Sequence, residues 1–239
     1  MKNNNACLLR LDAFRAMQVK QLIADSVHDV IRAAFPDKYF GLCQAYAVIG
    51  SSVASIIWHE EYRPVAGLAI FDAGNGQFVR CIDNNAFANT AGGGYHCWIV
   101  SFNSAEATEL LDFSLRNNKS YASAHGIRWN GSNADFLWGL QREINIGGAM
   151  DELPAQFAQN KVWFCETMEG QDWLQNHIFS HHNLYAKLTS LALRLIRTDP
   201  LAEYIPVYLV SGSRVCTDAL PTVPVRLMEA QSTSNEIGV

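Results

Sequence analysis

Apolar residues recur at helical spacing in two long segments of the chain, residues 8–35 and 171–197. Pro36 ends the first segment, because the residue before a proline avoids the helical conformation. Between them, residues 43–58 carry apolar or small side chains on nearly every side, and their few polar members are short. A helix that is apolar all round is a buried one. The pattern therefore predicts two amphipathic helices and one helix in the core.

After Trp58 the pattern changes to short apolar runs that are typical of strands. A Gly-Asn-Gly segment at 74–76 predicts a hairpin turn, and the run at 95–102 is apolar enough to be covered on both faces. Residues 117–154 lack a period and are predicted to be irregular, packed by their aromatic residues. Helices followed by successive strands favour an α+β fold with a mostly antiparallel sheet and flanking helices. The predicted strands are residues 65–72, 77–83, 95–102, 109–115, 161–166 and 205–210.

The length of 239 residues suits a single domain, which we assign to residues 1–220. Residues 221–239 are polar and without a period, and they are expected to form a mobile tail. Only 17% of the residues are charged, against about 25% in a typical soluble protein. This shortage indicates a large core. A homo-oligomer that covers part of its surface is an open alternative.

Net charge and hydropathy exclude some classes of partner. The net charge of −5 argues against binding to nucleic-acid phosphates. No apolar run approaches the roughly 20 residues that a membrane span needs, and no apolar segment follows the polar N-terminus as in a secretory signal. The six cysteines show no C-x-x-C pair. We therefore expect a cytoplasmic protein with reduced thiols, bound neither to a membrane nor to nucleic acid.

Three residues combine a chemically useful side chain with an unusual place in the pattern. Cys43 opens the predicted core helix, His96 lies in an apolar strand, and Asp112 lies in the next strand between Leu111 and Phe113. An imidazole and a carboxylate are costly to bury alone, but they can partner each other if the two strands pair.

These types suit nucleophilic catalysis by a thiolate. A helix N-terminus and a neighbouring imidazolium lower the pKa of a cysteine below about 8.5. His96 would accept the proton of Cys43 and later protonate the leaving group, while Asp112 would orient the imidazole. The backbone N–H of Cys43 is a ready oxyanion donor, and Tyr39 and Gln44 are candidates for a second donor. Trp98 alternates with His96 on one strand face and is a candidate for the cleft wall.

The local sequences around these residues resemble the transglutaminase-like branch of the papain-like cysteine enzymes. Residues 41–47 are similar to the G-x-C-x-x-x-A segment of its nucleophile, residues 96–98 to its H-x-W strand, and residues 111–112 to its strand-borne Asp. The spacings of 53 residues from Cys to His and 16 from His to Asp also fit. The resemblance covers residues 37–115 and implies a papain-like fold, in a bacterial branch of this superfamily. It further implies cysteine-dependent chemistry on a peptide, amide or acyl substrate, by hydrolysis or by transfer, without a cofactor.

Two other interpretations stay open. The chain lacks a clear oxyanion-hole Gln before Cys43 and carries a long aromatic segment, which would suit a non-catalytic binding or assembly module. Trp129 or Trp138 filling the cleft would favour that module. The third interpretation is a metal-dependent enzyme, because His177 and His181 have a helical spacing that can hold zinc; no Glu follows His177 to complete H-E-x-x-H.

Overall fold

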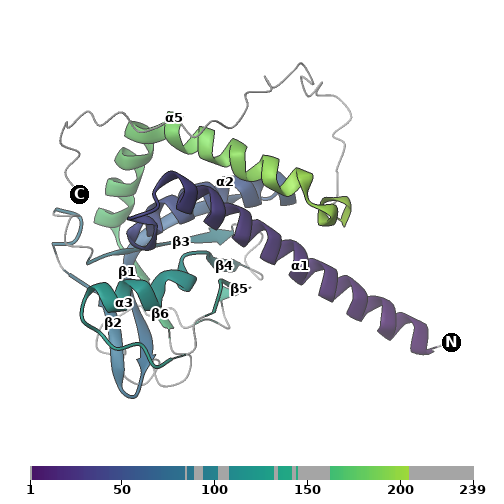
Figure 1. Ribbon diagram of the computed structural model, residues 1–239, viewed down its shortest axis with the longest axis horizontal. Helices are drawn as coiled ribbons and strands as arrows, with labels where there is room; N and C mark the ends of the chain where they lie inside the picture. Colours follow the sequence, from purple (N-terminus) through teal and green to yellow (C-terminus); the bar gives the residue numbers. More distant parts are fainter. Residues whose placement is uncertain are drawn as a thin grey trace.

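A computed structural model describes residues 2–83, 85–88, 94–101, 108–131, 134–141, 144 and 162–204, with side chains between residues 14 and 202. Within these ranges the protein is α+β, as the sequence predicts (Figure 1). The helices are α1 (Lys2–Ala34), α2 (Cys43–Trp58), α3 (Asn118–Ala124) and α5 (Met168–Thr198), with short 3-10 turns η1 (Tyr39–Gly41), η3 (Leu115–Asn117) and η6 (Pro200–Tyr204). The strands are β1 (Tyr62–Gly74), β2 (Gln77–Cys81), β3 (His96–Ser101), β4 (Glu109–Asp112), β5 (Leu137–Leu140) and β6 (Val162–Glu166).

The strands form one antiparallel sheet in the order β2-β1-β3-β4-β5, with β6 also paired to β1. Gly67 of β1 pairs with His96 of β3 and with β6, whereas Ala69 pairs with Cys81 of β2 and with β6. Strands β3 and β2 therefore follow one another along the same edge of β1. His96 begins β3 close to the point where this edge passes from one partner strand to the other.

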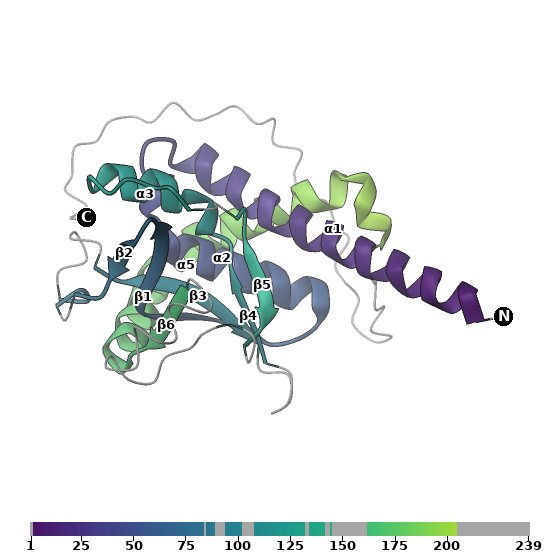
Figure 2. The ribbon, with the colours of Figure 1, turned by 90° about the horizontal axis from the view of Figure 1, so that it is seen from below.

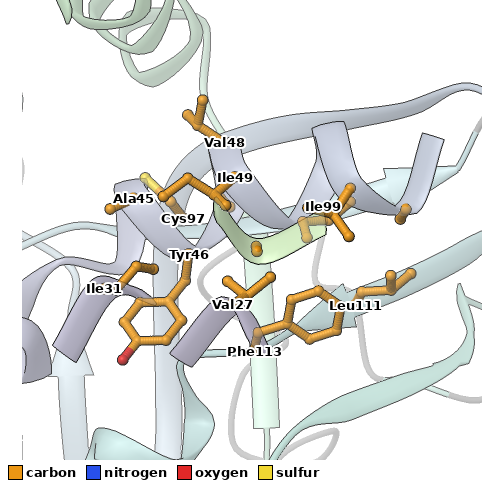
Figure 3. Close-up of a cluster of buried hydrophobic side chains, with 14 of the residues drawn as sticks. Val27, Ile31, Ala45, Tyr46, Val48, Ile49, Cys97, Ile99, Leu111 and Phe113 are labelled. Atoms are coloured by element: carbon orange, nitrogen blue, oxygen red, sulfur yellow. The ribbon is translucent and has the colours of Figure 1, made fainter. Parts of the chain in front are cut away.

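Helix α2 lies at the centre of the molecule, between the sheet and helices α1 and α5 (Figures 1 and 2). Most of its side chains are buried, which accounts for its lack of a polar face. The largest core cluster joins residues of α1, α2, β3 and β4, including Val27, Ile31, Ile49 and Ile99 (Figure 3). The Tyr46 hydroxyl in this cluster also bonds to Nδ1 of His28 on α1, at 2.8 Å.

The opposite face of the sheet is covered by a second apolar cluster. It includes Trp98, Leu110 and Phe164 from the strands, with Tyr121 of α3 and Trp129 packed against them. Every residue of β3 is buried because both faces of this strand are covered. Polar side chains on β3 and β4 therefore lie inside the protein, where they need partners.

The observed elements differ from the predicted ones mainly at their ends. Strand β4 stops at Asp112, three residues earlier than predicted, and α3 and β5 lie inside the segment predicted to be irregular. The strand predicted at 205–210 and the tail at 221–239 lie outside the described residues. None of the described helices has both the length and the apolar character needed to cross a bilayer.

Candidate active site

Cys43 is the first residue of α2 and lines a cleft of about 510 Å³. A tight turn, η1, precedes it, and the N-cap residue Leu42 provides no side-chain hydrogen bond to the helix. The first backbone N–H groups of a helix have no acceptor within the helix. The start of α2 therefore presents both a thiol and backbone donors to the cleft, with the favourable end of the helix dipole beside the sulfur.

His96 and Asp112 form a buried pair next to this cleft. The Nε2 atom of His96 donates to Oδ2 of Asp112 at 2.7 Å, from the first residue of β3 to the last residue of β4. Both side chains are nearly inaccessible, 7% and 1% exposed respectively. Because Nε2 is engaged by the carboxylate, Nδ1 is the ring nitrogen left to exchange a proton with Cys43.

Asp112 is held by a second set of hydrogen bonds. Its Oδ1 atom accepts from the backbone N–H of Ser114 at 2.9 Å and from the Ser114 hydroxyl at 2.7 Å. This is an Asx turn, which ends strand β4. With Oδ1 bound to Ser114 and Oδ2 to His96, the carboxylate is fixed in orientation, and its buried charge is compensated.

The thiol of Cys43 interacts with the Cys97 thiol and with the His96 imidazole. The hydrogen bond with Cys97 is the largest influence and lowers the pKa of Cys43; burial opposes it, and His96 lowers the pKa further, to about 5. Burial, together with the same interaction, raises the pKa of Cys97 well above its ordinary value. Cys97 thus remains a protonated donor while Cys43 carries the thiolate.

The charge on His96 complements this thiolate. Burial alone would lower the pKa of the imidazole, but the Asp112 carboxylate and the neighbouring Cys43 raise it to about 10. Between these two pKa values the site holds a thiolate and an imidazolium side by side. A thiolate beside an imidazolium is the state in which a cysteine can act as a nucleophile and a histidine as a proton donor.

Gln44 and Tyr95 lie beside the nucleophile. The Oε1 atom of Gln44 accepts from the Tyr95 hydroxyl at 3.5 Å and lies 3.8 Å from the Cys43 sulfur. Both side chains line the cleft. The amide oxygen of Gln44, an acceptor, faces the sulfur, so the role of Gln44 as an oxyanion donor stays a prediction. Tyr95 is a candidate for the same role that the sequence analysis missed, because a tyrosine ahead of a strand carries no distinctive signal.

Two other candidates lie outside the cleft. Tyr39 packs partly buried against the α1–α2 core, with its ring edge on His28, and Trp98 is 3% exposed and packs on Phe164. Trp98 does share the face of His96, as its nearly parallel ring shows, but it is buried there in the second apolar cluster. Neither residue lines the cleft, and both pack against the core clusters.

Trp129 and Trp138 do not fill the cleft. Trp129 packs on the far-face cluster, and Trp138 packs against Trp58 and Phe113, with its indole N–H bonded to Glu109 at 3.0 Å. These two tryptophans thus pack around the sheet, whereas Tyr121 of α3, in the same segment, lines the cleft.

His177 and His181 line the cleft but have other partners. Nε2 of His177 lies 2.8 Å from the Tyr185 hydroxyl, and Nδ1 of His181 donates to the carbonyl of His177 at 2.9 Å. Within the described ranges, no group of three or more His, Cys, Asp or Glu side chains is arranged to hold a metal ion.

Comparisons with known proteins identify a similar fold and no family. No family model matches the chain, and no curated protein matches it. A crystal structure described as genomics APC5867 superposes with a TM-score of 0.51 over 74% of this chain and 80% of that one. At 14% sequence identity, this likeness concerns the fold alone. Any function must therefore be argued from the site.

Proposed function

We propose that this protein is a cysteine-dependent enzyme of the transglutaminase-like, papain-like fold that hydrolyses or transfers acyl groups. Cys43 is the nucleophile, His96 the general base and acid, and Asp112 the residue that orients His96. The observation that carries the proposal is the meeting of a helix-terminal thiol with a buried His96–Asp112 pair at the wall of an open cleft. Neither a core cysteine nor a structural histidine requires this arrangement.

The mechanism follows from the atoms present. The Cys43 sulfur attacks the carbonyl carbon of an amide, ester or thioester, and the oxyanion is held by the N–H groups that begin α2. His96 then donates the Nδ1 proton to the leaving group, which gives an acyl-enzyme. Water or an acceptor nucleophile, deprotonated by His96, releases the acyl group and restores the thiolate. Asp112 and Ser114 keep the imidazole in the required orientation throughout.

Alkylation by iodoacetamide tests the state of Cys43, with Cys165 as an internal control. Cys165 is a half-buried thiol whose pKa is raised by burial and by Glu166, so its rate should rise about tenfold per pH unit between pH 6 and 8. The rate at Cys43 should stay nearly constant over this range, because its pKa is about 5. At pH 6 Cys43 should react roughly tenfold faster than Cys165, even after allowing for the lower nucleophilicity of a low-pKa thiolate. If the alkylation rate of Cys43 instead rises with pH as that of Cys165 does, Cys43 is not a thiolate at pH 6.

Acylation by 4-nitrophenyl acetate then separates an enzyme from a binding module. Wild-type protein should gain one acetyl group on Cys43, seen by peptide mass spectrometry, and lose it on incubation. His96→Gln should acylate far more slowly, and Cys43→Ser should give no adduct at that peptide. Fast alkylation without acylation or turnover would instead support the non-catalytic module.

A further inference from the structure

Beyond the catalytic residues, helix α5 lines the cleft with a row of rings. Trp173, His177 and His181 follow one another at helical spacing and all face the cleft. The Trp173 and His177 rings stack with centroids 5.0 Å apart, and the His177 and His181 centroids are 4.3 Å apart. The helix is kinked at His181, whose φ of −119° and ψ of 17° are not helical (Figure 1). The two parts of α5 therefore run in different directions, with His181 at the bend.

The imidazole of His177 belongs to this wall as a neutral ring. Burial lowers its pKa to about 4, and the neighbouring His181 contributes in the same direction. The Tyr185 hydroxyl at 2.8 Å occupies its Nε2 atom. Near neutral pH His177 therefore presents a flat, uncharged surface instead of a cation.

The row of rings reaches the nucleophile. Tyr95 lies 4.7 Å from Trp173 between ring centroids, and its hydroxyl bonds to Gln44, the residue after Cys43. The wall is thus continuous from the reacting sulfur to the bend of α5. A group attached to the acyl carbon can extend along these rings without leaving the cleft.

The facing wall is also aromatic and has little charge. Tyr121 of α3 and His125, the residue after this helix, stack with centroids 4.2 Å apart, and Phe40 of η1 lies at the same cleft. Lys38 adds one cation to the lining. Among the described residues of the lining, none is an Asp or a Glu, so a cationic substrate group would find no carboxylate partner there.

We propose that this cleft binds an uncharged acyl group, preferably an aromatic one, and disfavours an acyl group that carries a cation. The inference rests on Cys43 being the nucleophile. A volume of about 510 Å³ leaves room for a ring together with the leaving group. Burial against Trp173 provides the affinity, and the lack of a carboxylate provides the discrimination.

Methanethiosulfonates test this preference because they all react with a thiolate in the same way and differ only in the group that they transfer. The thiolate attacks the sulfenyl sulfur, forms a mixed disulfide and releases methanesulfinate, whatever group the sulfur carries. We would measure the rates of the methyl, benzyl and aminoethyl reagents at Cys43 by peptide mass spectrometry, each divided by its rate with 2-mercaptoethanol. The benzyl-to-aminoethyl ratio at Cys43 should be roughly tenfold above that of the free thiol.

Variants of α5 test whether Trp173 causes the preference for the benzyl reagent. Trp173→Ala should reduce the ratio of the benzyl rate to the methyl rate about fivefold, whereas Trp173→Phe should retain most of this ratio. Phe179→Ala is the matched control, because Phe179 is an aromatic residue of the same helix that is 81% exposed and does not line the cleft. It should leave the benzyl rate unchanged.

Two failures are distinguishable. If the methyl reagent reacts slowly with Cys43 relative to 2-mercaptoethanol, Cys43 is not the proposed nucleophile. If the methyl reagent reacts fast but the benzyl reagent shows no preference, only the proposed substrate class is overturned. The same conclusion holds if Trp173→Ala and Phe179→Ala lower the benzyl rate equally. A preference for the aminoethyl reagent would also overturn it, because it would identify the rings as a cation–π site.

Discussion

Replacing Asp112 with Asn removes one buried charge from the candidate site with little change of shape. The Asp112 side chain is 1% exposed and accepts hydrogen bonds from His96 and from both the backbone and the hydroxyl of Ser114. An amide oxygen can replace one of the two carboxylate oxygens as an acceptor. It cannot stabilise an imidazolium in a buried position as a carboxylate does.

The expected magnitude follows from the pKa of His96. The ordinary value is 6.5, burial would lower it, and the Asp112 charge contributes most to raising it to about 10. This difference corresponds to on the order of 5 kcal/mol in the preference for the protonated ring. In Asp112→Asn the imidazole should therefore be neutral at pH 7.

A neutral His96 should also change the pKa of Cys43. The pKa of Cys43 would keep the contribution of its hydrogen bond with Cys97 but lose that of the imidazolium, so it should rise. The midpoint of the alkylation rate against pH should move upward by about one to three units. At pH 6 the thiolate fraction of Cys43 should consequently fall from about 0.9 to between about 0.5 and about 0.01, and the alkylation rate should fall with it.

Two measurements check this reasoning. Iodoacetamide rates between pH 4 and 9 give the Cys43 midpoint, and the carbon-13 shift of the His96 ring gives the imidazole titration. Asp25→Asn is the matched control, because Asp25 pairs with Arg116 at 2.8 Å on a partly exposed surface of α1. It should move neither midpoint. If Asp112→Asn likewise leaves both titrations unchanged in a folded protein, the buried pair does not govern the thiol.

Three further outcomes are expected. Cys97→Ala should raise the pKa of Cys43 and shift its alkylation midpoint to higher pH, whereas Cys97→Ser, which keeps a donor, should shift it less; equal shifts would contradict the hydrogen bond. Gly50→Ala should lower the free energy of unfolding in urea by about 1–3 kcal/mol, because the new methyl group would lie 2.6 Å from the Phe113 ring. A gain in stability, usual for a helical Gly→Ala change, would refute this packing. His177, with its pKa lowered to about 4, should show no titration of its ring protons between pH 5.5 and 8, and a midpoint near 6.5 would contradict the neutral wall.

Much of the fold follows from the sequence because the spacing of apolar residues within a short segment predicts its secondary structure and its burial. The apolar surround of residues 43–58 identified the central helix, and the uniformly apolar run at 95–102 identified a strand covered on both faces. Cys43, His96 and Asp112 stand out for the same reason, since each is a polar exception in an apolar context. The contact of Ser114 with Asp112 could also have been predicted, because Asp-x-Ser is a pattern typical of an Asx turn.

Other features depend on pairings between distant parts of the chain. Alternation along β3 predicts that Cys97 lies on the face of the sheet opposite His96. It does belong to the cluster on the α2 side of the sheet, but its thiol bonds to Cys43 there. Strand alternation gives the face of a residue, whereas the position of a helix end above that face is set by tertiary packing.

The cleft depends even more on the assembled structure. Its walls come from η1, α3 and α5, which are distant from one another in the sequence, and from the bend of α5 at His181. The sequence by itself determined the helices, the antiparallel strands and the chemical types at the candidate site, because local periodicity and the cost of burying polar groups act within a few residues. Only the tertiary structure decided which rings face the thiol, because that depends on how whole helices pack.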